Sequence, residues 1–352
     1  MAITSLGEDR EIGIGIVGTG TISRSHANNL ARCSNVKLLA CCDIVKDAVG
    51  KFGAQFDVEH TFTDHRDMLA LEGLDAVVVA TPPFAHLDPV IDALQSGKHV
   101  LCEKPFAMNA KEAEAMASAA KSANLGLAVC CSRNRFRPVT QLAYRVATGG
   151  DLGEIYRARK VFLRRRGRPG YDILQDSAWF LTHERSGGGV IADLGHYHID
   201  EALWYLDWPK VLSVSANVTR NQVEPVIPSE VKNDVEEHVD AAIRLEGGKT
   251  FSLEISWITH MEGANGTWLY GTKGGLRVTD SVTLFQDRFG VPVDTRLPLP
   301  RRFPESDVDR DFIEAIREGR HPVTTADQGV VISKIVDAIY ESSVSQREIR
   351  LA

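Results

Sequence analysis

Short apolar runs alternate with helix-like segments over the first 130 residues. Each run is bounded by turn residues and is apolar on both faces, which is typical of strands buried in a parallel sheet. The strands predicted in this way are 12–17, Val36–Cys42, Leu74–Ala80, His99–Cys102 and Gly126–Cys131, with helices between them such as Pro89–Ser96 and Ala110–Asn124. This alternation predicts an α/β domain with a doubly wound parallel sheet and helices on both faces.

The pattern changes in the second half of the chain. Strands with alternating polar and apolar positions are predicted at Ile155–Leu163, Val211–Val218, Glu237–Glu246, Thr250–Ser256 and Thr267–Gly271, and helices at Thr140–Thr148 and Asp193–Leu206. Hairpin turns such as residues 246–249 favour an open, mostly antiparallel sheet. We therefore predict two domains, 1–130 and 131–352. Residues 308–343 are expected to form two helices, and it stays open whether these pack back on the first domain.

Composition narrows the class of protein. The chain has 352 residues, 43% of them hydrophobic, and a net charge of −7, which argues against an extended nucleic-acid surface. No apolar run approaches the ~20 residues of a membrane helix, and the N-terminus lacks the pattern of a secretion signal. We expect a cytoplasmic protein with no membrane partner. Cys41, Cys42, Cys130 and Cys131 lie in apolar runs without metal-ligand spacing, so reduced core thiols and no metal site are expected.

The first predicted strand ends in a glycine-rich turn. Gly18 allows a tight turn and Gly20 lets backbone approach a pyrophosphate at the start of the following helix, at Thr21 and Ile22. Ser23 occupies the place of the usual third glycine, which predicts a helix slightly further from the strand. The turn predicts a dinucleotide site.

Asp43 ends the second predicted strand, 25 residues after Gly18. A carboxylate at this place binds the hydroxyls of an adenosine ribose. The less favoured alternative is that Asp43 simply caps the next helix. Ile44 follows it, and no Arg or Lys within two residues is available for a 2′-phosphate, so NAD is favoured over NADP. Lys46 lies just beyond that range.

Two further motifs follow strands, where ligands bind in open α/β sheets. Residues 81–86, TPPFAH, combine two stiffening prolines with His86 at the start of the next helix. Residues 103–105 place Glu103 and Lys104 at the tip of a buried strand, where ionised groups are costly unless they are paired or used. Pro105 forces an extended backbone at Lys104 or permits a cis bond.

A third motif, residues 186–195, SGGGVIADLG, begins a predicted helix in the second half. Three consecutive glycines would let backbone lie against a flat molecule. Asp193, His196, Tyr197 and Asp200 are spaced to share one helix face, whereas His198 is expected to serve packing or to lie at the surface. Asp193 could simply cap the helix, but an acid, a histidine and a phenol together form a candidate proton-transfer group.

Four arginines, Arg164, Arg165, Arg166 and Arg168, fall within five residues. A solvated loop, an oligomer contact and a site for an anionic substrate group remain equal alternatives.

Taken in order, these motifs resemble the Gfo/Idh/MocA family of sugar and inositol oxidoreductases over nearly the whole chain. The matching segments are GIVGTGTIS, the strand-end Asp43, TPPFAH, EKP, RNRFRP, SGGGVIADLG, YGTKGGL and the C-terminal FIEAIREGRHPVTTADQG. The resemblance implies an N-terminal Rossmann domain that binds NAD(P), a C-terminal α/β domain whose sheet forms a homodimer or homotetramer contact, and no metal.

The resemblance also assigns roles to residues. Lys104 is the implied catalytic lysine, and Thr81, Pro82, His86 and Glu103 line the implied cofactor cleft. Trp179 matches a tryptophan that some members place near the cofactor, although Phe180 stands where those members often have arginine.

The sequence departs from the family's D-x-G-x-H pattern, because Tyr197 holds the place of the catalytic histidine and His196 precedes it. Either side chain can move a proton near Lys104 and Asp193. The predicted activity is hydride transfer between NAD and a secondary alcohol or ketone of a sugar, cyclitol or glycoside, with Lys104, Asp193, His196 and Tyr197 at the substrate. The alternatives are an NAD-sensing regulator without turnover, and a reductase like the biliverdin reductase and dihydrodiol dehydrogenase branches.

Overall fold

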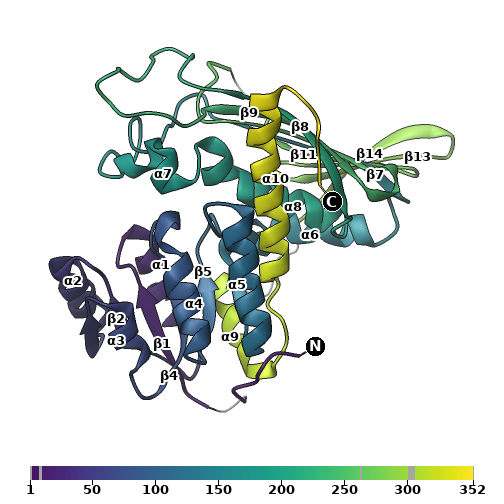
Figure 1. Ribbon diagram of the computed structural model, residues 1–352. Coiled ribbons are helices and arrows are strands. Elements are labelled where there is room, and N and C mark those ends of the chain that lie inside the picture. The colour runs from purple at the N-terminus through teal and green to yellow at the C-terminus, as the bar shows by residue number, and fades with distance from the viewer. Residues whose placement is uncertain (1, 8–9, 262–263, 300–305, 352) are drawn as a thin grey trace. The chain divides into compact units, whose positions relative to one another are not determined.

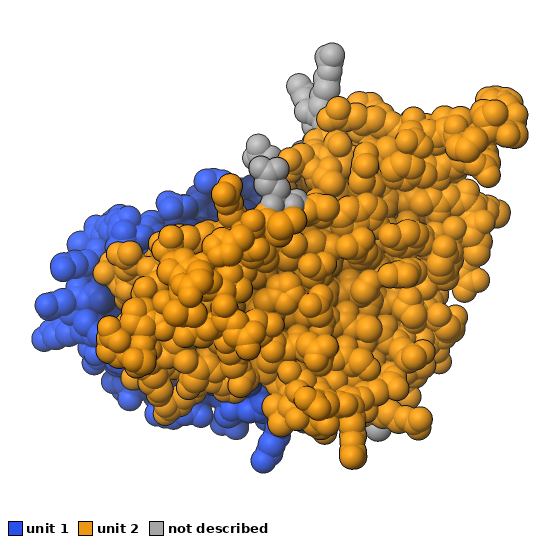
Figure 2. All heavy atoms as spheres, turned by 90° about the horizontal axis from the view of Figure 1, so that it is seen from above, with its two compact units in different colours: residues 1–132, 305–333 blue, residues 133–304, 334–352 orange. Residues whose placement is uncertain are grey.

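The computed structural model describes residues 2–7, 10–261, 264–299 and 306–351 (Figure 1). The chain divides into two compact units. The first comprises residues 1–132 and 305–333, and the second comprises residues 133–304 and 334–352 (Figure 2). Within the described residues, no helix has the length and apolar character needed to cross a membrane.

The first unit contains a parallel sheet with the strand order β3-β2-β1-β4-β5-β6. The strands are β1 (Ile12–Val17), β2 (Val36–Cys42), β3 (His60–Phe62), β4 (Leu74–Val79), β5 (His99–Cys102) and β6 (Leu127–Val129). β1, β4 and β5 are buried along their whole length, which explains why they read as continuous apolar runs. The strand order reverses between β1 and β4, and such a switch point is where open α/β sheets bind ligands.

Helices connect these strands. They are α1 (Thr21–Leu30), α2 (Lys46–Phe56), α3 (His65–Leu69), the short 3-10 helix η1 (Pro83–Ala85), α4 (Leu87–Gln95) and α5 (Ala110–Ala123). Because right-handed crossovers run in opposite directions on either side of the switch point, α1 and α4 cover opposite faces of the sheet. α4 packs beside α5, whereas α1 packs beside α9 (Val308–Glu318).

The C-terminal part of the chain completes the first unit. The Leu6 N–H donates to the Ile316 carbonyl (2.9 Å), and the Val129 N–H donates to the Thr324 carbonyl (3.3 Å). Residues 305–333 therefore form part of the first unit together with residues 1–132. The helix α10 (Ala326–Ser345) that follows contributes residues to both units.

The second unit is built on a nine-stranded sheet with the order β14-β13-β12-β11-β7-β10-β9-β8-β15. Its strands are β7 (Ile155–Leu163), β8 (Val211–Thr219), β9 (His238–Leu245), β10 (Thr250–Ser256), β11 (Gly266–Gly271), β12 (Gly275–Val278), β13 (Val282–Arg288), β14 (Val291–Leu297) and β15 (Ile349–Arg350). The pairing is antiparallel except between β7 and β10, so the mostly antiparallel sheet predicted from the sequence is confirmed.

Helices of the second unit pack against this sheet. α8 (His196–Tyr205) contacts β7 and β10, and α6 (Pro138–Thr148) contacts β12 and β13. The rings of Tyr144 on α6 and Trp204 on α8 stack at 3.8 Å. The remaining helical segments are the 3-10 helices η2 (Cys130–Phe136), η3 (Ala178–Leu181) and η5 (Glu246–Gly248), α7 (His183–Ser186) and the π-helical turn η4 (Ile191–Gly195).

Two predicted elements need correction. The strand expected at Gly126–Cys131 spans only β6, because the chain turns into η2 at Cys130. The helix expected from Asp193 to Leu206 begins as the π-helical turn η4 and becomes α-helical only at His196. The four cysteines predicted as core thiols are buried, as expected.

Candidate active site

The glycine-rich turn joins β1 to α1. Gly18 has a φ of +90°, and a Cβ there would lie 2.8 Å from the backbone of Ala80. A Cβ on Gly20 would meet no atom within 4 Å. Gly20 caps α1 without a side-chain hydrogen bond, and the first turn contains no acidic residue. The first N–H groups of α1 are thus available to an anion, which fits the pyrophosphate of a dinucleotide.

Ser23 strengthens this turn. Its side chain is fully buried, and its hydroxyl donates a hydrogen bond of 2.6 Å to the Gly18 carbonyl. The prediction that Ser23 merely spaces the helix from the strand is incomplete, because the hydroxyl ties α1 to the turn.

Asp43 also holds the turn. One carboxylate oxygen accepts from the Thr19 N–H (2.8 Å) and the Thr19 hydroxyl (2.9 Å), and the other accepts from the Val45 N–H (2.9 Å). Asp43 thus braces the segment that leads into the next helix and lies beside the glycine turn, and its role toward an adenosine ribose stays a prediction. It remains half-exposed, and Ile44, which follows it, is 90% exposed.

The strand-end motifs lie at the same edge of the sheet. Gly18, Asp43, Thr81 and Glu103 follow the carboxyl ends of β1, β2, β4 and β5, four neighbouring strands. The Thr81 hydroxyl donates to the Ala85 carbonyl (2.9 Å). His86 is fully buried, with Nε2 2.8 Å from the Thr81 carbonyl, and burial lowers its pKa. A neutral His86 therefore fixes the half-buried Thr81 and Pro82 loop rather than presenting a charge.

Glu103 and Lys104 differ in exposure. Glu103 is 3% exposed, and its carboxylate accepts from the Lys104 N–H (3.0 Å) and lies 2.8 Å from His26 Nε2. Lys104 is half-buried, and its bond to Pro105 is cis. Of this pair, the lysine is the side chain placed to meet a ligand.

In the second unit, the residues around Asp193 divide into two groups. Asp193 and Tyr197 are half-buried. The Trp257 indole N–H donates to Asp193 Oδ2 (3.0 Å), and an Arg133 guanidinium N–H donates to the Tyr197 hydroxyl oxygen (3.2 Å). A guanidinium at this distance stabilises negative charge on the phenol oxygen. His196 is instead 2% exposed, with Nδ1 3.3 Å from the Ile191 carbonyl.

Asp200 is not available to the proton-transfer group predicted for this helix face. Asp200 is fully buried and accepts two hydrogen bonds, of 2.6 and 2.7 Å, from the Arg135 guanidinium. Asp200 and Arg135 therefore form a structural ion pair. His198 serves packing, as predicted: its ring lies 4.8 Å from that of Phe162, and burial lowers its pKa well below the usual value.

The glycine run before Asp193 packs against protein. A Cβ on Gly188 would lie 1.8 Å from the Tyr340 hydroxyl, and one on Gly189 would lie 1.9 Å from the Glu236 carbonyl oxygen. The buried Glu236 carboxylate accepts from the Gly189 and Ile191 N–H groups and from the Tyr340 hydroxyl (2.8 Å). The expected contact between these glycines and a flat molecule is thus corrected, since Glu236 and Tyr340 occupy that space and hold the turn that carries Asp193.

We expect Gly189→Ala to lower the free energy of unfolding by about 3 kcal/mol, because the backbone at Glu236 must move away from the new methyl group. Differential scanning calorimetry measures the loss. Gly275→Ala is the control, because its Cβ would meet only ordinary contacts at 3.5 Å and beyond. Equal unfolding temperatures for the two variants would contradict this explanation.

The remaining sequence candidates lie elsewhere in the second unit. Arg168 is fully buried and pairs with Asp172 (2.8 Å) and Glu237 (3.0 Å), so this arginine of the cluster is structural. Arg166 is exposed and pairs with Asp172 (2.7 Å). Trp179 is half-buried and stacks on Phe180 at 3.9 Å.

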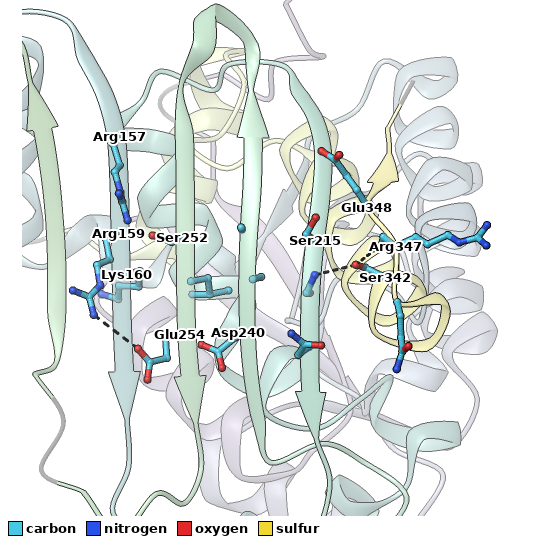
Figure 3. A pocket seen from close by; sticks show the side chains of 16 residues that line it. Arg157, Arg159, Lys160, Ser215, Asp240, Ser252, Glu254, Ser342, Arg347 and Glu348 are labelled. Carbon is cyan, nitrogen blue, oxygen red and sulfur yellow. Dashed lines mark hydrogen bonds and ion pairs between the residues drawn. The ribbon is translucent and has the colours of Figure 1, made fainter.

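A hollow of about 670 Å³ lies over β7, β10, β9 and β8 (Figure 3). Charged side chains of both signs line it, including Arg157, Arg159, Asp240 and Glu254. None of the site residues predicted from the sequence lines this hollow, so it is separate from the candidate catalytic groups.

Comparison with known proteins agrees with this geometry. Residues 12–130 match the model of the oxidoreductase family with an NAD-binding Rossmann fold, and residues 140–277 match that of the GFO/IDH/MocA C-terminal domain. The chain belongs to the Gfo/Idh/MocA family of oxidoreductases. Its first unit is accordingly an NAD-binding Rossmann domain.

Relatives of known activity extend over most of the chain. D-glucoside 3-dehydrogenase of Escherichia coli is 26% identical and covers 96% of this chain and 97% of its own. The NAD(+)-dependent scyllo-inositol 2-dehydrogenase of Bacillus subtilis is 26% identical over 90% of both chains. Levoglucosan dehydrogenase in complex with NADH and levoglucosan shares the fold, with a TM-score of 0.84 at 21% identity over 96% of this chain and 99% of its own.

Sequence reasoning missed the residues that hold the candidates in place. Trp257, Glu236 and Tyr340 come from distant segments, and no local pattern marks them. His26 did leave a signal, because it occupies a buried position of α1 together with Ser23, Ala27 and Leu30, where helical spacing calls for an apolar residue.

Proposed function

We propose that this protein is an NAD-dependent dehydrogenase that oxidises a secondary alcohol of a sugar, cyclitol or glycoside, or reduces the corresponding ketone. The observation that carries the proposal is the convergence of the glycine turn, Asp43, Thr81 and the Glu103–Lys104 pair on one edge of the parallel sheet. The activities of the relatives supply the substrate class.

Each candidate residue has a distinct role in this proposal. When bound, the nicotinamide supplies the hydride chemistry. Lys104 stabilises the negative charge that develops on the substrate oxygen. Tyr197 acts as the phenolate that takes the hydroxyl proton and becomes neutral, and the Arg133 guanidinium beside it stabilises the phenolate before this transfer. Asp193, held by the Trp257 indole, orients neighbouring hydroxyls.

The test is a screen of the purified protein with NAD against sugars, inositols and glycosides, with NADH absorbance as the readout. Turnover of at least one polyol is expected. Reduction of an unsaturated or aromatic-derived substrate with no polyol oxidation would instead favour the dihydrodiol dehydrogenase-like alternative.

NAD is expected to bind more tightly than NADP, because a 2′-phosphate would meet the carboxylate of Asp43 with the apolar Ile44 beside it. Titration of both cofactors against intrinsic protein fluorescence measures the two affinities. Asp43→Asn removes the negative charge and should reduce the difference between the affinities for NAD and NADP. Equal or tighter binding of NADP by the wild type would overturn the assignment of Asp43 to the ribose.

The proposal includes assembly and location. We propose a cytoplasmic homodimer or homotetramer joined through the nine-stranded sheet. On its exposed face Arg159 lies over the Trp268 ring (5.4 Å) and Arg157 over the Tyr270 ring (5.6 Å). The acidic Glu254 and Asp240 line the same hollow as these arginines (Figure 3). Aromatic and charged groups of both signs suit a self-complementary contact.

A further inference from the structure

A buried histidine connects three elements of the first unit. His26 lies on α1 and is 1% exposed. Its Nε2 is 2.8 Å from Glu103 Oε1, directly after β5, and its Nδ1 is 2.5 Å from Asp309 Oδ1, in the first turn of α9. Glu103 and Asp309 are themselves 3% and 1% exposed. We refer to Asp309, His26 and Glu103 as the buried triad.

The charge state of the triad follows from its hydrogen bonds. Both ring nitrogens face carboxylate oxygens, and only the doubly protonated imidazolium can donate to both. Burial lowers the pKa of His26, but hydrogen bonds with Asp309, Cys130 and Glu103 outweigh burial and raise the pKa well above 6.5. His26 is therefore a cation held between two carboxylates.

The triad extends to the backbone of Lys104. The second oxygen of Glu103 accepts from the Lys104 N–H (3.0 Å), and the second oxygen of Asp309 accepts from the Asn29 side-chain amide (2.9 Å). Each carboxylate is thus held at both oxygens. A fully satisfied buried network of this kind restricts the rotamers of its members and the backbone attached to them.

We propose that His26 and Asp309 are positioning residues, which fix the place of the Lys104 side chain through Glu103. This inference rests on the proposed function, since it presumes that Lys104 acts on the substrate. Charge stabilisation depends on placement, and a displacement of about 1 Å can cost on the order of 10²-fold in rate. The C-terminal segment thereby contributes to catalysis through α9, without a residue at the substrate.

Two members of the triad, His26 and Glu103, also resemble a metal-ligand set together with Cys130, because ligand atoms of these three residues lie within 4.8 Å of one another. A metal requires a ring nitrogen with a free lone pair, whereas the protonated imidazolium has none. The purified protein should therefore contain no stoichiometric zinc, which elemental analysis can check.

The decisive variant is Asp309→Asn, which keeps the shape and removes the charge. We expect kcat to fall about 10- to 100-fold with the KM for NAD within about twofold. Without the Asp309 charge, the pKa of His26 falls. The imidazolium is then lost as pH rises through the lowered pKa. The pH profile of kcat should therefore show a new descending limb in the variant, which the wild type lacks.

Asp311→Asn is the matched control. Asp311 lies on the same helix, is 6% exposed and accepts from the partly exposed Arg320 (2.9 Å), so its variant loses a half-buried ion pair without touching the triad. It should lose stability but gain no new pH limb. If Asp309→Asn does not fold, Asn29→Ala loosens Asp309 more gently and should give a smaller effect in the same direction.

Two readouts need no turnover. The first is the NMR titration of histidine-labelled apoprotein, in which the His26 signal is identified by its loss in His26→Gln. His26 should stay protonated well above pH 6.5 in the wild type. In Asp309→Asn it should lose its proton at a lower pH. Acetylation of Lys104 by acetic anhydride, followed by mass spectrometry, should become severalfold faster in Asp309→Asn but not in Asp311→Asn.

Four results would overturn the inference: a wild-type His26 that titrates near pH 6.5, bound zinc, the same kinetics in both variants, or Lys104 labelling that does not change. If the wild type turns over no substrate in the screen, the proposed function fails, and the histidine titration and the labelling still decide whether the triad holds Lys104.

Discussion

Lys104→Ala should lower kcat by roughly 10²- to 10⁴-fold while NAD still binds. The lysine follows β5 at the carboxyl edge of the sheet, and its loss removes the positive charge offered to the substrate oxygen. Steady-state kinetics with the best substrate from the screen measure kcat, and NAD fluorescence titration measures binding.

Lys98→Ala is the control for this experiment. Lys98 immediately precedes the same strand at its other end, where its ammonium donates to the Leu74 carbonyl (2.8 Å). Its variant should lose some stability but retain turnover. If Lys104→Ala keeps near-normal turnover, Lys104 has no catalytic role, and a regulator that binds NAD without using it becomes the better hypothesis.

Tyr197→Phe should reduce kcat by roughly 10²-fold or more, and should be more damaging than His196→Asn. Tyr197 is half-buried and its oxygen is bonded to a guanidinium, whereas His196 is 2% exposed and faces the Ile191 carbonyl. The phenol is therefore the group better placed to exchange a proton with a ligand. Because only one hydroxyl is removed, NAD affinity should be unchanged.

Tyr205→Phe serves as the control for loss of a buried hydroxyl, since Tyr205 lies on the same helix and donates to Glu201 (3.4 Å). Its turnover should remain close to that of the wild type. An active Tyr197→Phe together with an inactive His196→Asn would show that the histidine moves the proton.

The parallel sheet and its strand-end residues were predictable from the sequence because they depend on local patterns. Buried strands such as β1 and β4 are apolar throughout, and the residues after them must lie at one edge. β13 and β14 were not predicted. Most of β14 is exposed, so its sequence, VPVDTRL, carries no alternation that a buried face would impose.

The candidate site was predictable only where one segment supplies both the residue and the backbone structure that positions it. Lys104 and Tyr197 were found in this way. The π-helical turn at Asp193 was not, because its geometry depends on Glu236, which is 43 residues away in the sequence. For the same reason, spacing alone did not show that Asp200 is buried and paired with Arg135, which is 65 residues away in the sequence.

The division of the first unit between two stretches of chain has a consequence for biosynthesis. Residues 133–304, about 170 residues, separate the Rossmann strands from the segment that supplies α9 and Asp309. At ribosomal speeds this gap corresponds to roughly ten to thirty seconds. During that time the nascent chain holds His26 and Glu103 without their partner carboxylate and leaves apolar surface uncovered, so we expect this interval to be when the newly made protein most needs a chaperone.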